Sequence, residues 1–183
     1  MRAALYTFGI FLERAEHPAN QGFHDRNDPI LEDVAKAPGF IARAGYDDEG
    51  GDPPEWGPQV WPRWYEERGD GWSPATLSLW EDLEAIAAFT YSGLHREALR
   101  LGRSWFAQGP WPPYVIWWIS ADRQPDWAEA VRRFHRLADD GPGPTAFDLR
   151  RPFSPAGTAF SLDTSRLRRL SGERREARDA TPR

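Results

Sequence analysis

Short runs of apolar and aromatic residues recur along the chain and predict four β-strands. The runs are rich in β-branched and aromatic side chains and are bounded by polar, Gly or Pro positions, as is typical of strands. They cover residues 3–11, 40–46, 75–82 and 112–120. The last run, PPYVIWWIS, is apolar on both alternating sides, so both faces of its sheet are expected to be covered. Residues 145–149, TAFDL, are predicted to add an edge strand.

A second set of segments repeats its apolar positions at the helical period of about 3.6 residues. These segments cover residues 29–37, 83–106 and 127–140. Asp28 and Pro29 are suited to be the N-cap and the first residue of the first helix. Ser92 is suited to cap an internal break in the second helix, and Asp126 and Gly141 are suited to begin and end the third.

Three segments fall outside these elements. Residues 12–28 are predicted to form a polar loop. Residues 47–74 form a long insertion in which four tryptophans lie among Gly, Pro and acidic residues. So much aromatic surface predicts that the insertion folds over a face or a pocket mouth. Beyond the single domain of residues 1–150, we expect residues 151–183 to form an extended, mobile tail.

The order of the predicted elements is strand, helix, strand, strand, helix, strand, followed by an added helix. This order predicts an α+β domain of the ferredoxin-like type, with an antiparallel sheet and helices on one face. Because the last full strand shows no polar alternation, the other face needs a cover as well. We expect a second subunit to supply it, which makes the chain a predicted homodimer.

Composition narrows the function classes. The chain of 183 residues has no cysteine, which excludes disulfides, thiolate catalysis and thiolate metal sites. Its formal net charge is -5 with the two signs interleaved, so neither a nucleic acid nor a membrane is an expected partner. No signal peptide or membrane-spanning stretch is evident, and we expect a soluble, cytoplasmic protein. Phosphate-binding loops, the dinucleotide fingerprint, the nucleophile elbow and the zinc His-Glu-x-x-His pair are all missing from the sequence.

Residues 89–106, FTYSGLHREALRLGRSWF, carry a histidine beside the apolar face of the predicted helix. At about 100° per residue, His95 falls next to the stripe that contains Trp105. An imidazole in this position either bonds a polar partner or uses its lone pair. One interpretation is a structural histidine bonded to a backbone carbonyl or to Tyr91. The other is a haem-iron ligand or a base in an aromatic pocket, where Gly102 leaves room for a bulky group to approach.

Residues 23–28, FHDRND, place a polar cluster directly before the first predicted helix, where the helix dipole favours anions. This cluster is suited to bind an anion or relay a proton, and it is equally suited to be a capping and turn network. The two other histidines, His17 and His135, are expected in a surface loop and on a solvated helix face. The cluster consists of His24, Asp25, Arg26 and Asn27.

Residues 61–72, WPRWYEERGDGW, combine Trp64 and Tyr65 with charged side chains. Aromatic and polar groups in one loop suit a ligand lid and a dimer interface equally.

Four longer stretches carry a resemblance to a known family. They are GFHDRNDP, APGFIARAGY, GWSPATLSLWEDLEAIAAFTYSGLHREALRLGRSWF and WPPYVIWWISAD, within residues 3–149. They resemble the bacterial family called domain of unknown function 3291. The arrangement is also similar to the dimeric α+β barrel superfamily, which includes antibiotic-biosynthesis monooxygenases, haem-degrading monooxygenases and non-enzymatic members. This resemblance implies a dimeric α+β barrel with a pocket between sheet and helices.

The resemblance also implies roles for the candidate residues. In haem-degrading relatives a histidine on the helix after the third strand binds iron, and His95 lies on the equivalent element. In quinone-forming relatives, polar and aromatic pocket residues position a phenolic substrate. The implied function is a monooxygenase-like oxidoreductase for a small aromatic or apolar molecule, with haem as a candidate cofactor. The alternative is a non-catalytic small-molecule-binding or dimerisation protein. Together with the residue patterns above, this gives His95, His24 and Asp25 as the predicted catalytic residues. The predicted substrate-binding residues are Arg26, Asn27, Trp64, Tyr65, Trp80, Tyr91 and Trp105.

Overall fold

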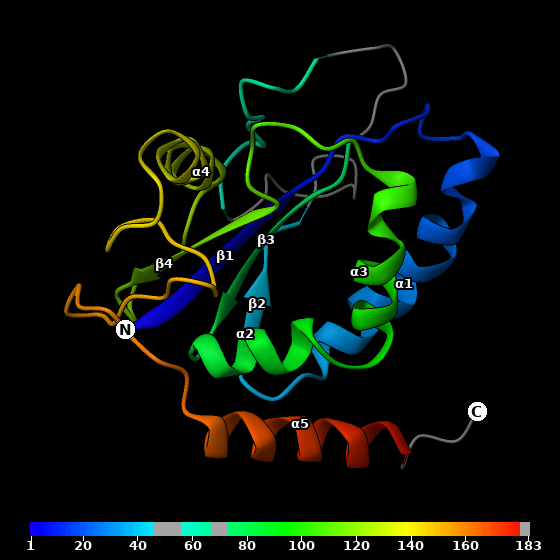
Figure 1. Cartoon of the computed structure of the whole chain (residues 1–183). Helices are drawn as coiled ribbons and strands as arrows, with labels where there is room; N and C mark the ends of the chain where they lie inside the picture. Colours follow the sequence, from blue (N-terminus) through cyan, green and yellow to red (C-terminus); the bar gives the residue numbers. More distant parts are fainter. Residues whose placement is uncertain (46–55, 67–72, 180–183) are drawn as a thin grey trace.

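The computed structural model describes residues 1–45, 56–66 and 73–179. Within these ranges the chain forms one sheet surrounded by helices (Figure 1). The strands are β1 (Arg2–Phe8), β2 (Phe40–Arg43), β3 (Ala75–Trp80) and β4 (Tyr114–Ile119). The helices are a short 3-10 turn, η1 (Pro18–Asn20), and α1 (Gln21–Ala35), α2 (Leu83–Thr90), α3 (Gly93–Trp105), α4 (Trp127–Asp140) and α5 (Thr164–Asp179).

The four strands form an antiparallel sheet in the order β2-β3-β1-β4. All four predicted strands are present, with shorter ends, and their order is consistent with the ferredoxin-like prediction. Strand β1 is central and pairs along its length with β3 on one side and β4 on the other. The predicted edge strand is reduced to a single bridge between Phe147 and Ile116 of β4.

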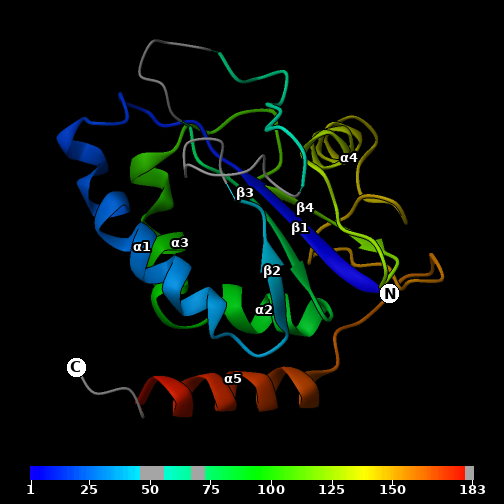
Figure 2. The ribbon, with the colours of Figure 1, turned by 180° about the vertical axis from the view of Figure 1, so that it is seen from behind.

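Successive side chains of β1 point to two faces that different helices cover. Tyr6 and Phe8 belong to the core beneath α4. Ala3 and Leu5 belong to the core beneath α2. Figures 1 and 2 both show α4 on one side of the strands and the pair α1 and α3 on the other.

This chain itself fills the α4 face. Tyr6 makes edge-on contacts with Trp127 and Phe134, with ring centroids 6.2 and 5.3 Å apart. Trp56 of the insertion is 3% exposed and joins the same core. The expectation of helices on one face alone is therefore wrong, because the apolar stripe of α4 must also be buried and finds the second face of the sheet. This face therefore does not need a second subunit to cover it. The homodimer itself stays a prediction.

Helices α1 and α3 form an antiparallel pair (Figure 2). Near one end, Gly22 of α1 lies so close to Trp105 of α3 that an added Cβ would stand 3.2 Å from the indole atom Cζ2. Near the other end, Asp33 of α1 lies close enough to His95 of α3 to influence its pKa. Gly22 therefore lies near the Trp105 end of α3, and Asp33 lies near the His95 end.

Helix α1 begins earlier than its sequence pattern predicts. Asp28 and Pro29 are not its N-cap and first residue, because the helix starts at Gln21 after the buried Asn20. Pro29 lies inside the helix and is exposed. Packing of the half-buried Phe23 against an aromatic cluster favours helix over the preceding turn and outweighs the missing N–H of the proline. The expected loop of residues 12–28 is thus partly helical.

The other helix boundaries follow the prediction. The second helical segment breaks into α2 and α3, with Ser92 as the N-cap residue of α3. Its hydroxyl donates to the carbonyl of Ala88 instead of capping an amide. Asp126 accepts a hydrogen bond from the Glu129 amide at the start of α4, and Gly141 ends that helix with a φ of 75°.

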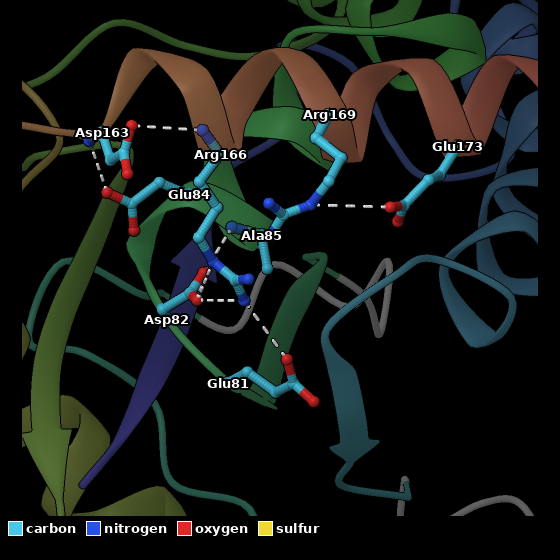
Figure 3. A network of polar contacts seen from close by, with 8 residues as sticks. All are labelled: Glu81, Asp82, Glu84, Ala85, Asp163, Arg166, Arg169 and Glu173. Carbon is cyan, nitrogen blue, oxygen red and sulfur yellow. Dashed lines mark hydrogen bonds and ion pairs between the residues drawn. The ribbon is translucent and has the colours of Figure 1, made fainter.

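The expected extended tail instead forms α5, which packs along α2 (Figure 3). Arg166 binds Asp82 and Glu81, and the Asp163 amide donates to Glu84 at 2.7 Å. Leu170 is buried in the core beneath α2, and the partly buried Leu167 packs against the same core. The sequence pattern missed α5 because polar contacts hold most of it. Among the described helices, none is both long and apolar enough to cross a bilayer.

Candidate functional site

The sheet carries a group of hydroxyls on the face turned toward α1, α2 and α3. Thr7 of β1 pairs with Thr76 of β3 and with Tyr114 of β4, and the next row places Ser78 opposite Leu5. Directly paired residues share a face, so these side chains lie together. We call Thr7, Thr76, Ser78 and Tyr114 the hydroxyl patch.

The hydroxyls are ordered by bonds to one another and to nearby groups. The Thr7 and Thr76 oxygens lie 2.8 Å apart. The indole nitrogen of Trp80 donates to Ser78 at 2.9 Å. A threonine pair uses one hydrogen in its mutual bond, which leaves one hydrogen to donate and lone pairs to accept. The patch can therefore bind either a donor or an acceptor group.

Solvent reaches this part of the sheet although its central strand is paired on both sides. Ala4 and Tyr6 of β1 are completely buried on the α4 face. Leu5 and Thr7, which alternate with them, stay partly exposed on the opposite face, as do Thr76 and Tyr114. Protein side chains therefore do not fill the space in front of them completely. We call this space the hollow.

The inner side of α3 also leaves room. Gly102 lies on the same side of α3 as Ala98, which packs in the aromatic cluster. An added Cβ at Gly102 would meet one atom within 4 Å, Cδ2 of Phe106 at 3.9 Å. A side chain could be accommodated there without displacing its neighbours.

An aromatic cluster covers the end of the sheet where β1 leaves it. Phe11 stacks on Phe106 with ring centroids 5.2 Å apart and an interplanar angle of 14°. Phe23 of α1 meets Phe11 and Trp105 edge-on, at 5.2 and 5.9 Å. These rings give the surroundings of the hydroxyl patch an apolar, aromatic character.

Two tyrosines connect the hydroxyl patch to the α2–α3 junction. The Tyr114 hydroxyl accepts a hydrogen bond from the Leu149 amide at 3.2 Å. Burial raises the pKa of Tyr114 above its ordinary value, and the nearby Tyr91 hydroxyl raises it further. Tyr114 therefore stays a neutral hydroxyl. Tyr91, a sequence candidate, thus lies near the patch, and so does Trp80.

His95 meets a backbone carbonyl. Its Nδ1 lies 3.1 Å from the carbonyl oxygen of Thr90, and its ring lies 5.0 Å from that of Phe89. Removal from water lowers the pKa of His95, and the positive charge of Arg174 lowers it as well. A neutral histidine whose Nδ1–H donates to a carbonyl satisfies these contacts. The geometry thus favours the structural interpretation.

Haem does not fit this neighbourhood well. A haem held by His95 would need room for a porphyrin beside the imidazole, and the Phe89 ring and the nearly buried Arg174 side chain already lie near it. Arg174 also adds positive charge beside a cationic iron centre. The haem ligand stays a prediction, and we derive no chemical step through it. Within the described residues, no group of three or more acidic or histidine side chains could hold a metal ion.

The cluster of residues 24–27 lies inside α1, not before it. His24 Nε2 bonds the Ala15 carbonyl at 2.8 Å. Asp25 accepts from Gln21 at 2.6 Å, and Arg26 donates to the Gly22 carbonyl at 2.8 Å. Asn27 donates to Asp28 and lies on the same side of α1 as Phe23. These are local contacts, and the predicted anion site at the helix start is not formed by them.

The two histidine candidates are not brought together. His24 lies at the end of the antiparallel pair where Phe23 meets Trp105. His95 is ten residues from Trp105 along α3, about 15 Å away along the helix axis. The sequence hypothesis that both act on one substrate finds no support in this arrangement.

The aromatic residues of the insertion lie on the α4 face. Trp64 meets Phe134 and His135 edge-on at 5.8 and 5.4 Å, and Tyr65 stacks on Trp61 at 4.4 Å. They lie across the sheet from the hydroxyl patch. His135 is not simply solvated, because it accepts a hydrogen bond from the Arg63 amide at 3.0 Å. Residues 47–55 and 67–72, with Trp72, lie outside the described residues, so the lid prediction is not tested there.

The hydroxyl patch is not among the residues predicted from the sequence, although several of its neighbours are. Thr7, Thr76 and Ser78 interrupt apolar strands at every second position, which is the signal that could have found them. The sequence does predict that Gly102 leaves space, and it gives Tyr91 and Trp80 as predicted substrate-binding residues.

No curated protein and no solved structure matches the chain. The family model described as "Domain of unknown function (DUF3291)" matches residues 2–162, which is most of the chain and ends just before α5. This chain therefore belongs to the DUF3291 family.

Proposed function

We propose that the chain binds a small aromatic or apolar molecule in the hollow between the sheet and the α1–α3 pair. The partial exposure of Leu5 and Thr7 on a central strand carries the proposal. A binding site of this type combines apolar walls with a few polar groups that fix orientation. The aromatic cluster supplies the walls, and the hydroxyl patch supplies the polar groups.

The polar groups favour a neutral ligand group. Tyr114 keeps its proton, because burial and Tyr91 raise its pKa. Thr7 and Thr76 are neutral hydroxyls that can donate and accept. A phenol, alcohol or carbonyl matches such groups without bringing an unpaired charge into the hollow.

If the chain is an enzyme, the expected reaction is monooxygenase-type turnover of the bound molecule. It needs a base within hydrogen-bond reach of the substrate. Both histidine candidates bond backbone carbonyls, His95 through Nδ1 and His24 through Nε2. Binding without turnover is therefore the function that the geometry supports better.

Filling the hollow tests the proposal. Gly102→Leu adds a side chain on the inner side of α3, whereas Gly172→Leu adds one in α5, where a Cβ meets nothing within 4 Å. Using 2-naphthol and indole as probes, saturation-transfer NMR should show binding to the wild type and to G172L. Binding should be lost in G102L with its thermal unfolding still cooperative. Equal binding to both variants, or no binding to the wild type, would overturn the proposal.

A second measurement separates binding from turnover. Oxygen consumption and product analysis with the same probes should show no conversion. If the wild type converts a probe and His95→Asn does not, the result would favour monooxygenase-type turnover and would assign His95 a chemical role.

Dimerisation stays a prediction as well. A barrel formed through the sheets of two chains would need the face that α4 and Trp56 occupy. A dimer of this chain is therefore expected to use another surface.

A further inference from the structure

We propose that a second copy of this chain docks on the outer surface of the α1–α3 pair. In the symmetric dimer, α1 of each copy lies over α3 of the other. The proposal rests on the charge of the two helices and on the level at which each charge lies, and it is independent of the proposed ligand.

Helix α1 presents an acidic stripe to solvent. Asp25, Asp28 and Glu32 are all exposed and are spaced three and four residues apart. This spacing places them on one side of the helix, opposite the inward residues Phe23 and Ile30. None of the three has an ion pair within the described part of the chain.

Helix α3 presents a basic stripe to solvent. Arg96, Arg100 and Arg103 are exposed and also lie three and four residues apart. They point away from the inward residues Ala98 and Trp105. Among the described residues none of the three guanidinium groups has a hydrogen bond or ion pair, although the chain as a whole is acidic.

The two stripes have matching levels. Because the helices are antiparallel, the Gly22–Trp105 contact and the proximity of Asp33 to His95 indicate which ends of α1 and α3 lie together. At about 1.5 Å per residue, this arrangement places each acid at about the level of an arginine. The matched pairs are Asp25 with Arg103, Asp28 with Arg100, and Glu32 with Arg96.

Symmetry turns this match into a docking geometry. Consider a two-fold axis that lies in the interface between the two copies and runs parallel to the helices. It places α1 of one copy over α3 of the other and keeps every level unchanged. Each acid then faces the arginine of its own level across the interface. A two-fold axis perpendicular to the helices would place acid over acid and is disfavoured.

A second copy fits this surface better than a generic polyanion. Helices α1 and α3 pack against each other, and the axes of packed helices lie about 8–10 Å apart, so the negative charge of the acidic stripe acts on the surroundings of the arginines. It repels a polyanion that approaches the arginines, whereas a second copy neutralises both stripes. Leu99 and Tyr91, which are 49% and 53% exposed, offer apolar surface beside the charges.

The test exchanges charges at the central pair. Sedimentation velocity in 50 mM and 500 mM NaCl should show a wild-type dimer that salt dissociates, as expected for an interface of exposed ion pairs. R100E and D28R should each weaken dimerisation at least tenfold, because each places like charges opposite each other twice. Mixing R100E with D28R should restore the dimer, since every pair is then complementary. R132E on α4, also exposed, is the matched control and should dimerise as the wild type does.

Each other outcome overturns the proposal. A wild type that stays monomeric at 200 µM in low salt has no such interface. A dimer that R100E and D28R leave unchanged uses another surface. Loss of the dimer in both variants without recovery on mixing shows that the two charges do not face each other. Circular dichroism melts confirm that the variants fold, as expected for exposed substitutions.

Discussion

The guanidinium of Arg174 lies over the ring of Phe89, with its carbon 4.2 Å from the ring centre. The same side chain, 7% exposed, pairs with Asp33 of α1. A residue of α5 thus joins α2 and α1, and it lies beside His95 of α3. Loss of this contact is expected to loosen the helical side of the domain.

Arg174→Ala should lower the free energy of unfolding by about 2–3 kcal/mol, because it removes a cation–π contact and leaves Asp33 without its partner. Urea unfolding followed by circular dichroism measures the loss. Arg168→Ala, an exposed arginine of the same helix, is the control and should change stability by less than about 0.5 kcal/mol. Equal effects of the two variants would contradict the role of Arg174.

Acid should destabilise the chain through His95. Its pKa is lower in the folded chain than the ordinary value of 6.5, so the unfolded chain binds more protons below that pH. Stability should therefore be complete above pH 6.5 and fall as the pH is lowered through this range. Urea titrations at pH 7.5 and 5.5 should show a smaller loss for His95→Asn than for the wild type. Some loss should remain, because the pKa of His135 is also lowered, first by desolvation and then by Arg63. An equal loss in both proteins would rule out His95 as a cause.

Gly22 of α1 and Gly102 of α3 should respond oppositely to replacement by alanine. Gly102→Ala should stabilise the chain by about 0.5–1 kcal/mol, because alanine favours helix and its Cβ meets no close neighbour. Gly22→Ala should destabilise it, because its Cβ would stand 3.2 Å from the Trp105 ring. Thermal unfolding distinguishes the two, and a destabilised G102A would mean that the space in front of Gly102 is filled.

Tyr6→Phe should leave stability unchanged or raise it by up to about 1 kcal/mol. The Tyr6 hydroxyl is fully buried and has no hydrogen-bond partner among the described residues, and burial raises its pKa. Removing it relieves a buried polar group without changing the packing against Phe134. Chemical denaturation measures the difference, and a clear loss would show that the hydroxyl binds a group such as an internal water.

Thr7 and Thr76 should show a coupling of about 0.5 kcal/mol in a double-mutant cycle with valine, because their hydroxyls bond each other across the strands. Additive effects would show that solvent replaces the mutual bond at no cost. The same two variants should weaken probe binding in the hollow.

The strands and the caps of α4 could be predicted because their signals are local. The start of α1 could not, since Asp28 and Pro29 form a good helix start and only the burial of Phe23 shows that the helix begins earlier. Helix α5 lacks a continuous apolar stripe, and its partners Asp33 and Asp82 are distant in sequence. For the site, the period of the strands indicates which residues share a face. It does not indicate which face a distant loop covers, which is why the sequence could not show that Trp64 and Tyr65 lie across the sheet from the hydroxyl patch.

The pairing of Arg174 with Asp33 spans 141 positions of the chain. During synthesis from the amino terminus, α1, α2 and α3 all emerge long before their common partner in α5. The helical side of the domain therefore reaches its final set of contacts only when the last helix is made. We expect a nascent chain halted before Arg174 to be digested by protease at α1 and α3 sooner than at the sheet.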